Sequence, residues 1–168
     1  MDDVQLITAE LIEQVAAQAR ESPRRRKNYN FHRSAQENPH RFLNVLLEGT
    51  YVQPHRHLNP PKAESFLVLS GHCAVVLFNS EGNVLEGYVL GSTPFDGKKP
   101  GCVRGNTVSI GIDVQPGIWH TIAALSPVAV CYEVKPGPWD PETDKGFAPW
   151  APPEGSPEAP AYLARLLA

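Results

Sequence analysis

The chain has 168 residues, with 15 Lys or Arg and 18 Asp or Glu, so its formal net charge is −3. This length is typical of one compact domain, and without an excess of positive charge we expect no nucleic-acid partner. The longest apolar stretches, such as residues 73–78, are far shorter than the roughly 18 to 20 residues of a membrane span. The acidic amino terminus, MDDVQLITAEL, is unlike a secretory signal, so we expect a cytoplasmic protein.

The first element that the sequence predicts is a helix over residues 8–21, with Thr8 as its N-cap, an apolar stripe on one face and Pro23 beyond its end. The basic run at residues 24–27 follows. Such a run is a solvated linker in one interpretation and a lip that attracts an anionic small molecule in the other.

From residue 28 to residue 136 the sequence changes to short apolar segments separated by turn residues, which predicts strands. Residues 79–83, which include Gly82 and Asn83, predict a hairpin turn, and residues 91–105 predict a loop. Many short strands at this spacing indicate an all-β sandwich or barrel. The predicted strands lie near 42–51, 64–70, 72–78, 84–90, 107–114, 118–124 and 127–135.

The carboxyl-terminal segment is rich in proline and cannot form a regular element until a short helix at residues 160–167. We expect Trp139, Phe147 and Trp150 to pin this segment to the strands. Three regions follow: an amino-terminal helix and basic linker (1–27), a β domain (28–138) and a carboxyl-terminal extension that packs on it (139–168). The three cysteines are widely spaced without a C-x-x-C pair, so we expect free, buried thiols.

Two histidines, His55 and His57, lie two residues apart in a strand setting, which places both imidazoles on one face. Glu64 opens the next strand, and His120 follows the Pro116-Gly117 turn. Three imidazoles and one carboxylate can hold one divalent metal ion with open positions. Zinc, iron(II), manganese, nickel and cobalt all suit this set of ligands.

These two blocks resemble the two motifs of the cupin superfamily. In that pattern a glycine, five residues, His-x-His, a glutamate and a later glycine are followed downstream by Pro, Gly, two residues and His. The glycines at positions 49, 71 and 117 stand at the distances from His55, Glu64 and His120 that the pattern has. Six residues separate His57 from Glu64, where the family usually has three or four.

The chain is most similar to the WbuC family of cupin-fold metalloproteins, through Asn30-Phe-His32, PHRH, ESFLVLSG, PGIWH and YEVKPGPW. This resemblance covers most of residues 28–140. It implies a cupin jelly-roll β-barrel with a metal ion in its mouth and a link to bacterial surface-polysaccharide synthesis. Cupins often form dimers, so the resemblance also implies a homodimer.

The face that carries the two paired histidines predicts further residues of a substrate pocket. If residues 55 and 57 point inward, strand alternation places Tyr51 and Gln53 on the same face, while Phe66 shares the face of Glu64. Tyr51 is therefore a candidate proton donor, and packing inside the barrel is the alternative of equal weight.

Three charged residues are candidates for contacts to the substrate. Lys62 and Arg41 could meet an anionic substrate, although exposed cations serve solubility by default. Glu133 lies among apolar neighbours in VAVCYEV, and we expect it to face solvent. The alternative is an inward position in which it acts as a base toward a ligand histidine. The other histidines, at positions 32, 40 and 72, are expected to be structural.

Three functions remain open from the sequence. The first is an isomerase or epimerase whose metal ion polarises a small-molecule substrate of the sugar or sugar-phosphate type, including anionic sugars. The second is an iron(II)-dependent dioxygenase. The third is a metal-dependent sugar-binding or regulatory module that performs no reaction.

Overall fold

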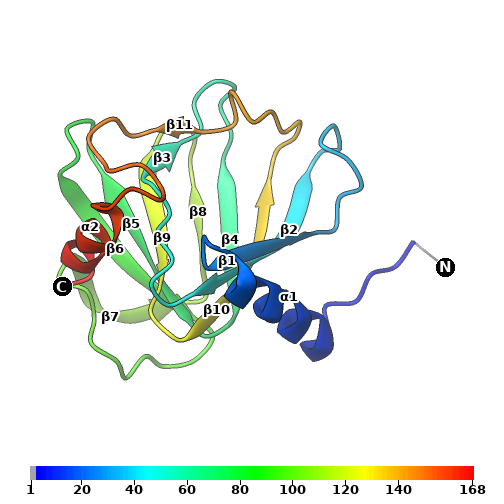
Figure 1. Cartoon of the computed structure of the whole chain (residues 1–168), viewed down its shortest axis with the longest axis horizontal. Helices are drawn as coiled ribbons and strands as arrows, with labels where there is room; N and C mark the ends of the chain where they lie inside the picture. Colours follow the sequence, from blue (N-terminus) through cyan, green and yellow to red (C-terminus); the bar gives the residue numbers. More distant parts are fainter. Residues whose placement is uncertain (1–2) are drawn as a thin grey trace.

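The computed structural model describes residues 3–168, without the side chains of residues 104–106. Two short helices accompany strands that make up most of the regular structure (Figure 1). The elements in chain order are α1 (Ala9–Glu21), β1 (Arg26–Asn30), β2 (His40–Leu47), β3 (His55–Arg56), β4 (Glu64–Ser70), β5 (His72–Phe78), β6 (Val84–Gly91), β7 (Val103–Ser109), β8 (Gly111–Val114), β9 (Trp119–Ala124), β10 (Val128–Lys135), β11 (Gly146–Phe147) and α2 (Ala159–Leu166).

The strands form two sheets, and this corrects the expectation of a closed barrel. One sheet has the order β1-β2-β10-β4-β8 and the other the order β11-β3-β9-β5-β6-β7. All pairs are antiparallel except β6 and β7. Within the described residues no strand pairing joins the edge strands of one sheet to those of the other, so the sheets face each other as two layers.

The main core lies between these two layers. It combines buried side chains of the five-stranded sheet, such as Phe66 and Cys131, with those of the six-stranded sheet, such as Val75 and Ile122. Apolar residues that alternate along each strand therefore meet across the gap, as expected for packed sheets. The free thiols of Cys73 and Cys131 are buried in this core, as predicted.

Helix α1 covers the outer face of the five-stranded sheet, where its buried residues form a second core with β2 and β10 (Figure 1). The helix begins as predicted, because Oγ1 of Thr8 accepts a hydrogen bond of 3.2 Å from the backbone N–H of Leu11. Such a cap satisfies one of the amide groups that a helix start leaves unpaired.

Most predicted strands are present, and β4 and β5 have the predicted bounds. The hairpin between β5 and β6 is also confirmed, because the N–H of Asn79 donates to the carbonyl of Asn83 and Gly82 has φ 88°. The predicted strand at 107–114 is instead divided into β7 and β8, which belong to different sheets. The sequence did not predict β1 or β11, and of the strand setting expected around His55 and His57 only the two residues of β3 form a strand. Part of the basic run expected to be a linker forms the start of β1.

The carboxyl-terminal segment runs past β3 through the short strand β11 and ends in α2 (Figure 1). Trp150 packs against Phe78 and Trp119, with ring centroids 5.0 and 6.1 Å apart. Trp139 and Phe147 are 46% and 51% exposed, but Phe147 pairs with His55 between β11 and β3, and the N–H of Trp139 donates to the carbonyl of Ala35. Neither helix in residues 3–168 is long and apolar enough to cross a membrane.

Candidate metal centre

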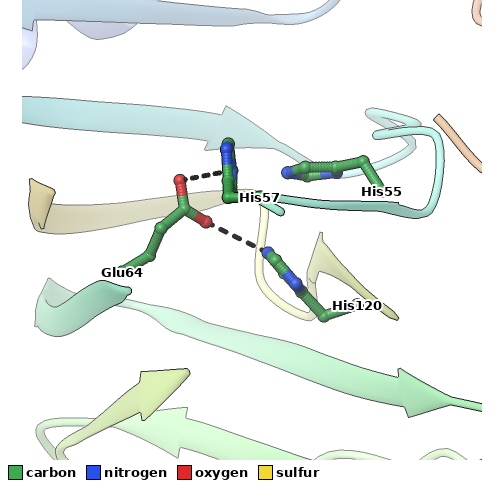
Figure 2. Close-up of side chains that lie close together, drawn as sticks. All are labelled: His55, His57, Glu64 and His120. Carbon is green, nitrogen blue, oxygen red and sulfur yellow. Dashed lines mark hydrogen bonds and ion pairs between the residues drawn. The ribbon is translucent and has the colours of Figure 1, made fainter. Parts of the chain in front are cut away.

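Four buried side chains from three neighbouring segments converge at one end of the space between the sheets. His55 lies in β3, His57 follows that strand directly, Glu64 opens β4 and His120 lies in β9. One nitrogen or oxygen atom from each residue lies within 4.8 Å of those of the other three. Figure 2 shows the carboxylate of Glu64 facing the rings of His57 and His120, with the ring of His55 directed toward the same space.

Backbone pairing holds the histidines in this arrangement. His55 is the register partner of His120 in the ladder between β3 and β9, which places their rings 4.6 Å apart. The turn before β9 is tied to the other ligand segment, because the N–H of Gly117 donates to the carbonyl of His57 at 2.9 Å. Gly117 has φ 82°, a conformation that glycine adopts without strain. The Pro-Gly turn therefore sets the position of His120 relative to His57.

Each of the three imidazoles has its Nδ1 atom against a backbone carbonyl. His55 Nδ1 lies 3.0 Å from the carbonyl of Gln53, and His120 Nδ1 lies 2.9 Å from that of Ile118. His57 Nδ1 contacts the carbonyl of Asp144. A carbonyl only accepts hydrogen bonds, so each Nδ1 carries a proton, and Nε2 is the ring nitrogen left to face the interior of the group. Metal-binding histidines are oriented in the same way.

The Glu64 carboxylate stands between two of these Nε2 atoms. Its Oε1 lies 2.8 Å from Nε2 of His57, and its Oε2 lies 3.0 Å from Nε2 of His120. The His57 contact is close but lacks hydrogen-bond geometry, so this buried nitrogen has no hydrogen-bond partner. Lone pairs that face a carboxylate at these distances need a cation or a proton between them. Ligands about 2.1 Å from one metal ion and at right angles would be roughly 3 Å apart, so the two contacts of Glu64 match the spacing of ligands around one ion.

Electrostatic interactions keep His55 and Glu64 in the protonation states that bind a cation. Burial lowers the pKa of His55 well below its ordinary value, with the nearby charge of Lys145 adding to the effect. Burial alone would raise the pKa of Glu64, but its close contacts with His120 and His57 and the charge of Lys135 outweigh it and hold the pKa well below its ordinary value. A neutral imidazole and an ionised carboxylate are the forms that coordinate metals.

A buried charge network centred on Asp144 supports the site. The Asp144 carboxylate accepts hydrogen bonds from Lys62 Nζ at 2.7 Å and from Lys135 Nζ at 2.8 Å. Lys135 Nζ also lies 3.5 Å from Oε1 of Glu64. Asp144 thus orients His57 through its backbone carbonyl and fixes two lysines through its side chain. These attractions outweigh the desolvation of Lys135, so its pKa is raised and it stays a cation.

The group opens onto a cavity of about 680 Å³ that is lined by His55, Glu64 and His120. Apolar side chains, including Val52, Phe66 and Ile122, cover part of its wall. Positively and negatively charged side chains cover another part of the wall. The charged lining residues are Arg24, Arg26, Arg33, Glu64, Glu133, Lys135, Asp144, Lys145 and Glu154.

Tyr51 and Gln53 do not lie where strand alternation places them. The Tyr51 hydroxyl donates to the carbonyl of Pro152 at 2.8 Å, and Gln53 Nε2 donates to that of Ala148 at 3.2 Å. Neither residue lines the cavity, whereas Val52 does. Residues 51–54 are not part of a strand, and both Pro54 and His55 are buried, so the inward positions change phase at Pro54. Tyr51 thus contacts the carboxyl-terminal segment.

The other candidate pocket residues divide into two groups. Phe66 and Glu133 line the cavity, and Glu133 is only 5% exposed, so the expected solvent-facing position of Glu133 is wrong. Lys62 is buried beside Asp144 rather than exposed, and its amine also donates to the carbonyl of Pro138. Arg41 pairs with Glu37 and does not line the cavity.

Several residues of the site have no signal in the sequence that could have identified them. Asp144 and Lys145 belong to a segment expected to be irregular. The alternation of β10 does carry a signal, because Glu133 and Lys135 lie two residues apart and share a face. Two histidines expected to be structural, His32 and His40, stack at 4.0 Å and line the cavity.

Three solved structures are similar in fold. The capsular polysaccharide assembling protein CapF from Staphylococcus aureus has a TM-score of 0.54 at 20% identity, over 75% of this chain and 30% of CapF, so this chain spans less than a third of its length. Protein SO0799 from Shewanella oneidensis has 0.53 at 13% identity, over 85% and 87%. TT1209 from Thermus thermophilus has 0.51 at 15% identity, over 80% and 98%. The fold is cupin-like.

No curated protein matches the sequence. One family model does, and its description is "Domain of unknown function (DUF6016)". The match covers residues 7–90, which is half of the chain and includes α1, three of the four converging side chains and the strands β1 to β5. This chain belongs to the DUF6016 family.

Proposed function

We propose that His55, His57, Glu64 and His120 bind one divalent metal ion, and that the adjoining cavity holds a small anionic ligand of the sugar or sugar-phosphate class. The protein then acts on this ligand as an isomerase or epimerase. The observation that carries the proposal is the convergence of three Nε2 atoms and one carboxylate, each Nδ1 being held by a backbone carbonyl. Burying polar and charged groups of this kind is costly unless they are hydrogen-bonded, paired or coordinate an ion.

When bound, the ion would polarise an oxygen of the ligand as a Lewis acid. The chain's own residues supply the remaining requirements. Lys135 and Lys145 line the cavity beside the proposed metal ligands, and Lys135, which stays a cation, favours an anion there. Phe66, Val52 and Ile122 exclude water from the same wall, which strengthens every electrostatic interaction inside.

The substrate class rests on two likenesses. The sequence resembles the WbuC family, which is associated with surface-polysaccharide gene clusters. The fold is similar to that of CapF, which is described as a capsular polysaccharide assembling protein. A likeness in fold alone does not transfer an activity. The link to surface-polysaccharide synthesis is therefore part of the proposal, and the cavity's charge is the support that comes from this chain.

Glu64→Gln tests the metal centre. The substitution keeps the shape of the side chain and removes its charge, so we expect it to weaken metal binding by at least about tenfold. Elemental analysis after chelation and refilling, followed by titration with zinc, iron(II), manganese, nickel and cobalt, measures this effect. Glu158→Gln is the matched control, because Glu158 is exposed at the start of α2 and its side chain makes no cap hydrogen bond there.

One metal ion per chain in the wild-type protein, lost or weakened in Glu64→Gln, supports the proposed centre. Unchanged affinity in Glu64→Gln shows that Glu64 is not a ligand, and absence of metal from the refilled wild-type protein contradicts the centre altogether. Oxygen uptake by the iron(II)-loaded protein favours a dioxygenase over an isomerase. Tight ligand binding without any product favours a binding module.

We also propose a cytoplasmic homodimer, as the cupin resemblance implies. Sedimentation equilibrium should then give twice the chain mass of 18.4 kDa. A mass equal to that of one chain across micromolar concentrations contradicts the dimer and leaves the metal centre unaffected, because all four converging residues come from one chain.

A further inference from the structure

A second polar group lies on the cavity wall, on two strands that do not contribute to the metal centre. It consists of Asn44 from β2 and Glu133 from β10, and both residues line the cavity. Asn44 Nδ2 donates a hydrogen bond of 3.1 Å to Oε2 of Glu133. The ladder between the two strands pairs Cys131 with Asn44 and Glu133 with Phe42, so the two polar side chains are diagonal neighbours.

This pair has hydrogen-bonding capacity that the protein does not use. Oδ1 of Asn44 is buried and has no partner. Among the described residues, the carboxyl of Glu133 has one hydrogen-bond partner, Asn44, although Glu133 is only 5% exposed. A buried polar atom without a partner costs about 1 to 3 kcal/mol. Such a cost is rare in native structures and calls for a partner that the chain itself does not contain.

The surroundings of Glu133 favour the protonated carboxyl, which can donate a hydrogen bond. Its register partners are Phe42 on β2 and Phe66 on β4. Burial, aided by the charge of Glu64, raises the pKa of Glu133 to about 8, although Lys135, Lys145 and the hydrogen bond from Asn44 act in the opposite direction. In the metal-free protein the carboxyl is therefore mostly protonated at neutral pH. The pair then offers one O–H donor and one amide acceptor, which is the set that a hydroxyl group needs.

The position of the pair relative to the metal centre sets the size of a shared ligand. Glu64 and Phe66 lie on the same face of β4, and Glu133 is the register partner of Phe66. The Cα atoms of Glu133 and Glu64 are thus diagonal neighbours across adjacent strands, about 7 to 8 Å apart. A ligand of a few carbon atoms can reach both places. Lys135, two residues from Glu133, reaches Glu64 and adds positive charge at the metal end.

We infer that Asn44 and Glu133 form a hydroxyl-binding subsite, which selects a polyhydroxylated acid whose anionic group lies at the metal centre. The inference rests on the proposed metal centre and specifies its ligand class. A simple fatty acid of equal length could place its carboxylate at the metal ion and the lysines. It would leave the free donor and acceptor of Glu133 and Asn44 without a hydrogen-bond partner. The subsite therefore discriminates by the hydroxyl groups, in the way that a site built to hydrogen-bond a substrate rejects an analogue without that group.

The test compares gluconate with hexanoate, which has the same chain length and carboxylate but no hydroxyl groups. Isothermal titration calorimetry of the metal-loaded protein should show at least about tenfold tighter binding of gluconate. Glu133→Met and Asn44→Leu should reduce this ratio to about one, whereas Glu133→Gln, which keeps a donor, should retain most of it. Glu158→Met is the control for loss of a carboxylate elsewhere and should leave the ratio unchanged.

Metal content separates the two proposals. If all variants hold as much metal as the wild-type protein while the ratio changes as stated, the subsite is established. If the wild-type protein holds metal but does not prefer gluconate, or if the preference survives both Glu133→Met and Asn44→Leu, the subsite is overturned and the metal centre stands. If the wild-type protein holds no metal, the proposed function is contradicted, and the subsite that rests on it is contradicted with it. A variant that does not fold leaves the wild-type ratio and Glu133→Gln to decide.

Discussion

His120→Ala is expected to abolish stable metal binding and to have the largest effect of any single substitution on the site. In the proposed centre His120 is one of three nitrogen ligands, and its Nε2 atom lies 3.0 Å from Oε2 of Glu64. Its loss therefore removes one ligand and one of the two imidazoles that position the carboxylate. Because loss of a residue that merely supports a ligand costs about 10- to 100-fold in metal affinity, we expect at least about 100-fold here.

The measurement is metal content after chelation, refilling and gel filtration, together with a competition titration against a chromophoric chelator. His72→Ala is the matched control. His72 lies in β5, outside the group, and its ring contacts the carbonyl of Thr93. We expect full metal content in His72→Ala and less than about a tenth of an equivalent in His120→Ala. Equal content in the two variants would show that His120 is not a ligand.

The residues of this centre could be predicted from the sequence because their spacing is local. Two histidines two positions apart and a histidine three residues after the glycine of a Pro-Gly turn are each placed by one turn or one strand. The structure brings these residues and Glu64 together even though six residues separate Glu64 from His57. The additional loop residues are accommodated outside the group, since Leu58 is exposed and the N–H of Lys62 returns to the carbonyl of His57.

The prediction from strand alternation did not hold where the chain does not form a strand. The prediction for Tyr51 and Gln53 assumed one continuous period of two up to His57, but β3 contains only two residues. Proline has no N–H to donate to a ladder, and the inward phase shifts at Pro54. The alternation of β10 holds from Cys131 to Lys135, so Glu133 lies inside with Lys135 and Cys131. The acidic side chain of Glu133 suggested a solvent-facing position, but its place in the strand directs it toward the cavity.

The charge network could not be predicted, because its members come from segments far apart in the sequence. Lys62 belongs to a loop, Lys135 ends a strand and Asp144 lies in a segment without regular structure until β11. Considered alone, each of these residue types is typical of a solvent-exposed position. Only the tertiary arrangement, in which the carboxyl-terminal segment runs past β3, places all three in contact.

Asp144→Asn is expected to be the most destabilising conservative substitution near the site. The variant keeps the backbone carbonyl that contacts His57 and the shape of the side chain, but it removes the charge that faces Lys62 and Lys135. Breaking a buried ion pair by removing one partner costs about 3 to 5 kcal/mol, because the other charge stays buried without compensation. Urea unfolding of the metal-free protein measures this loss separately from any effect of metal binding.

Asp140→Asn controls for a change of charge in the same segment. Asp140 is exposed, and its carboxylate accepts a hydrogen bond from the N–H of Glu142. We expect this variant to unfold within about 0.5 kcal/mol of the wild-type protein. Adding Lys62→Met to Asp144→Asn should recover part of the lost stability, since it removes one of the uncompensated cations. A strictly additive loss would show that Lys62 and Asp144 are not coupled.

The same substitution should change how stability depends on pH. Burial alone would raise the pKa of Asp144, but the charge and hydrogen bond of Lys135 and the hydrogen bond of Lys62 outweigh it, so the folded pKa is lower than the ordinary value. The ionised carboxylate thus stabilises the fold above the unfolded pKa, and this stabilisation is lost as the pH falls through the folded pKa. The wild-type protein should therefore lose more of its free energy of unfolding than Asp144→Asn does as the pH falls below the ordinary carboxyl range. Parallel pH profiles for the two proteins would mean that Asp144 does not carry the charge that holds the two lysines.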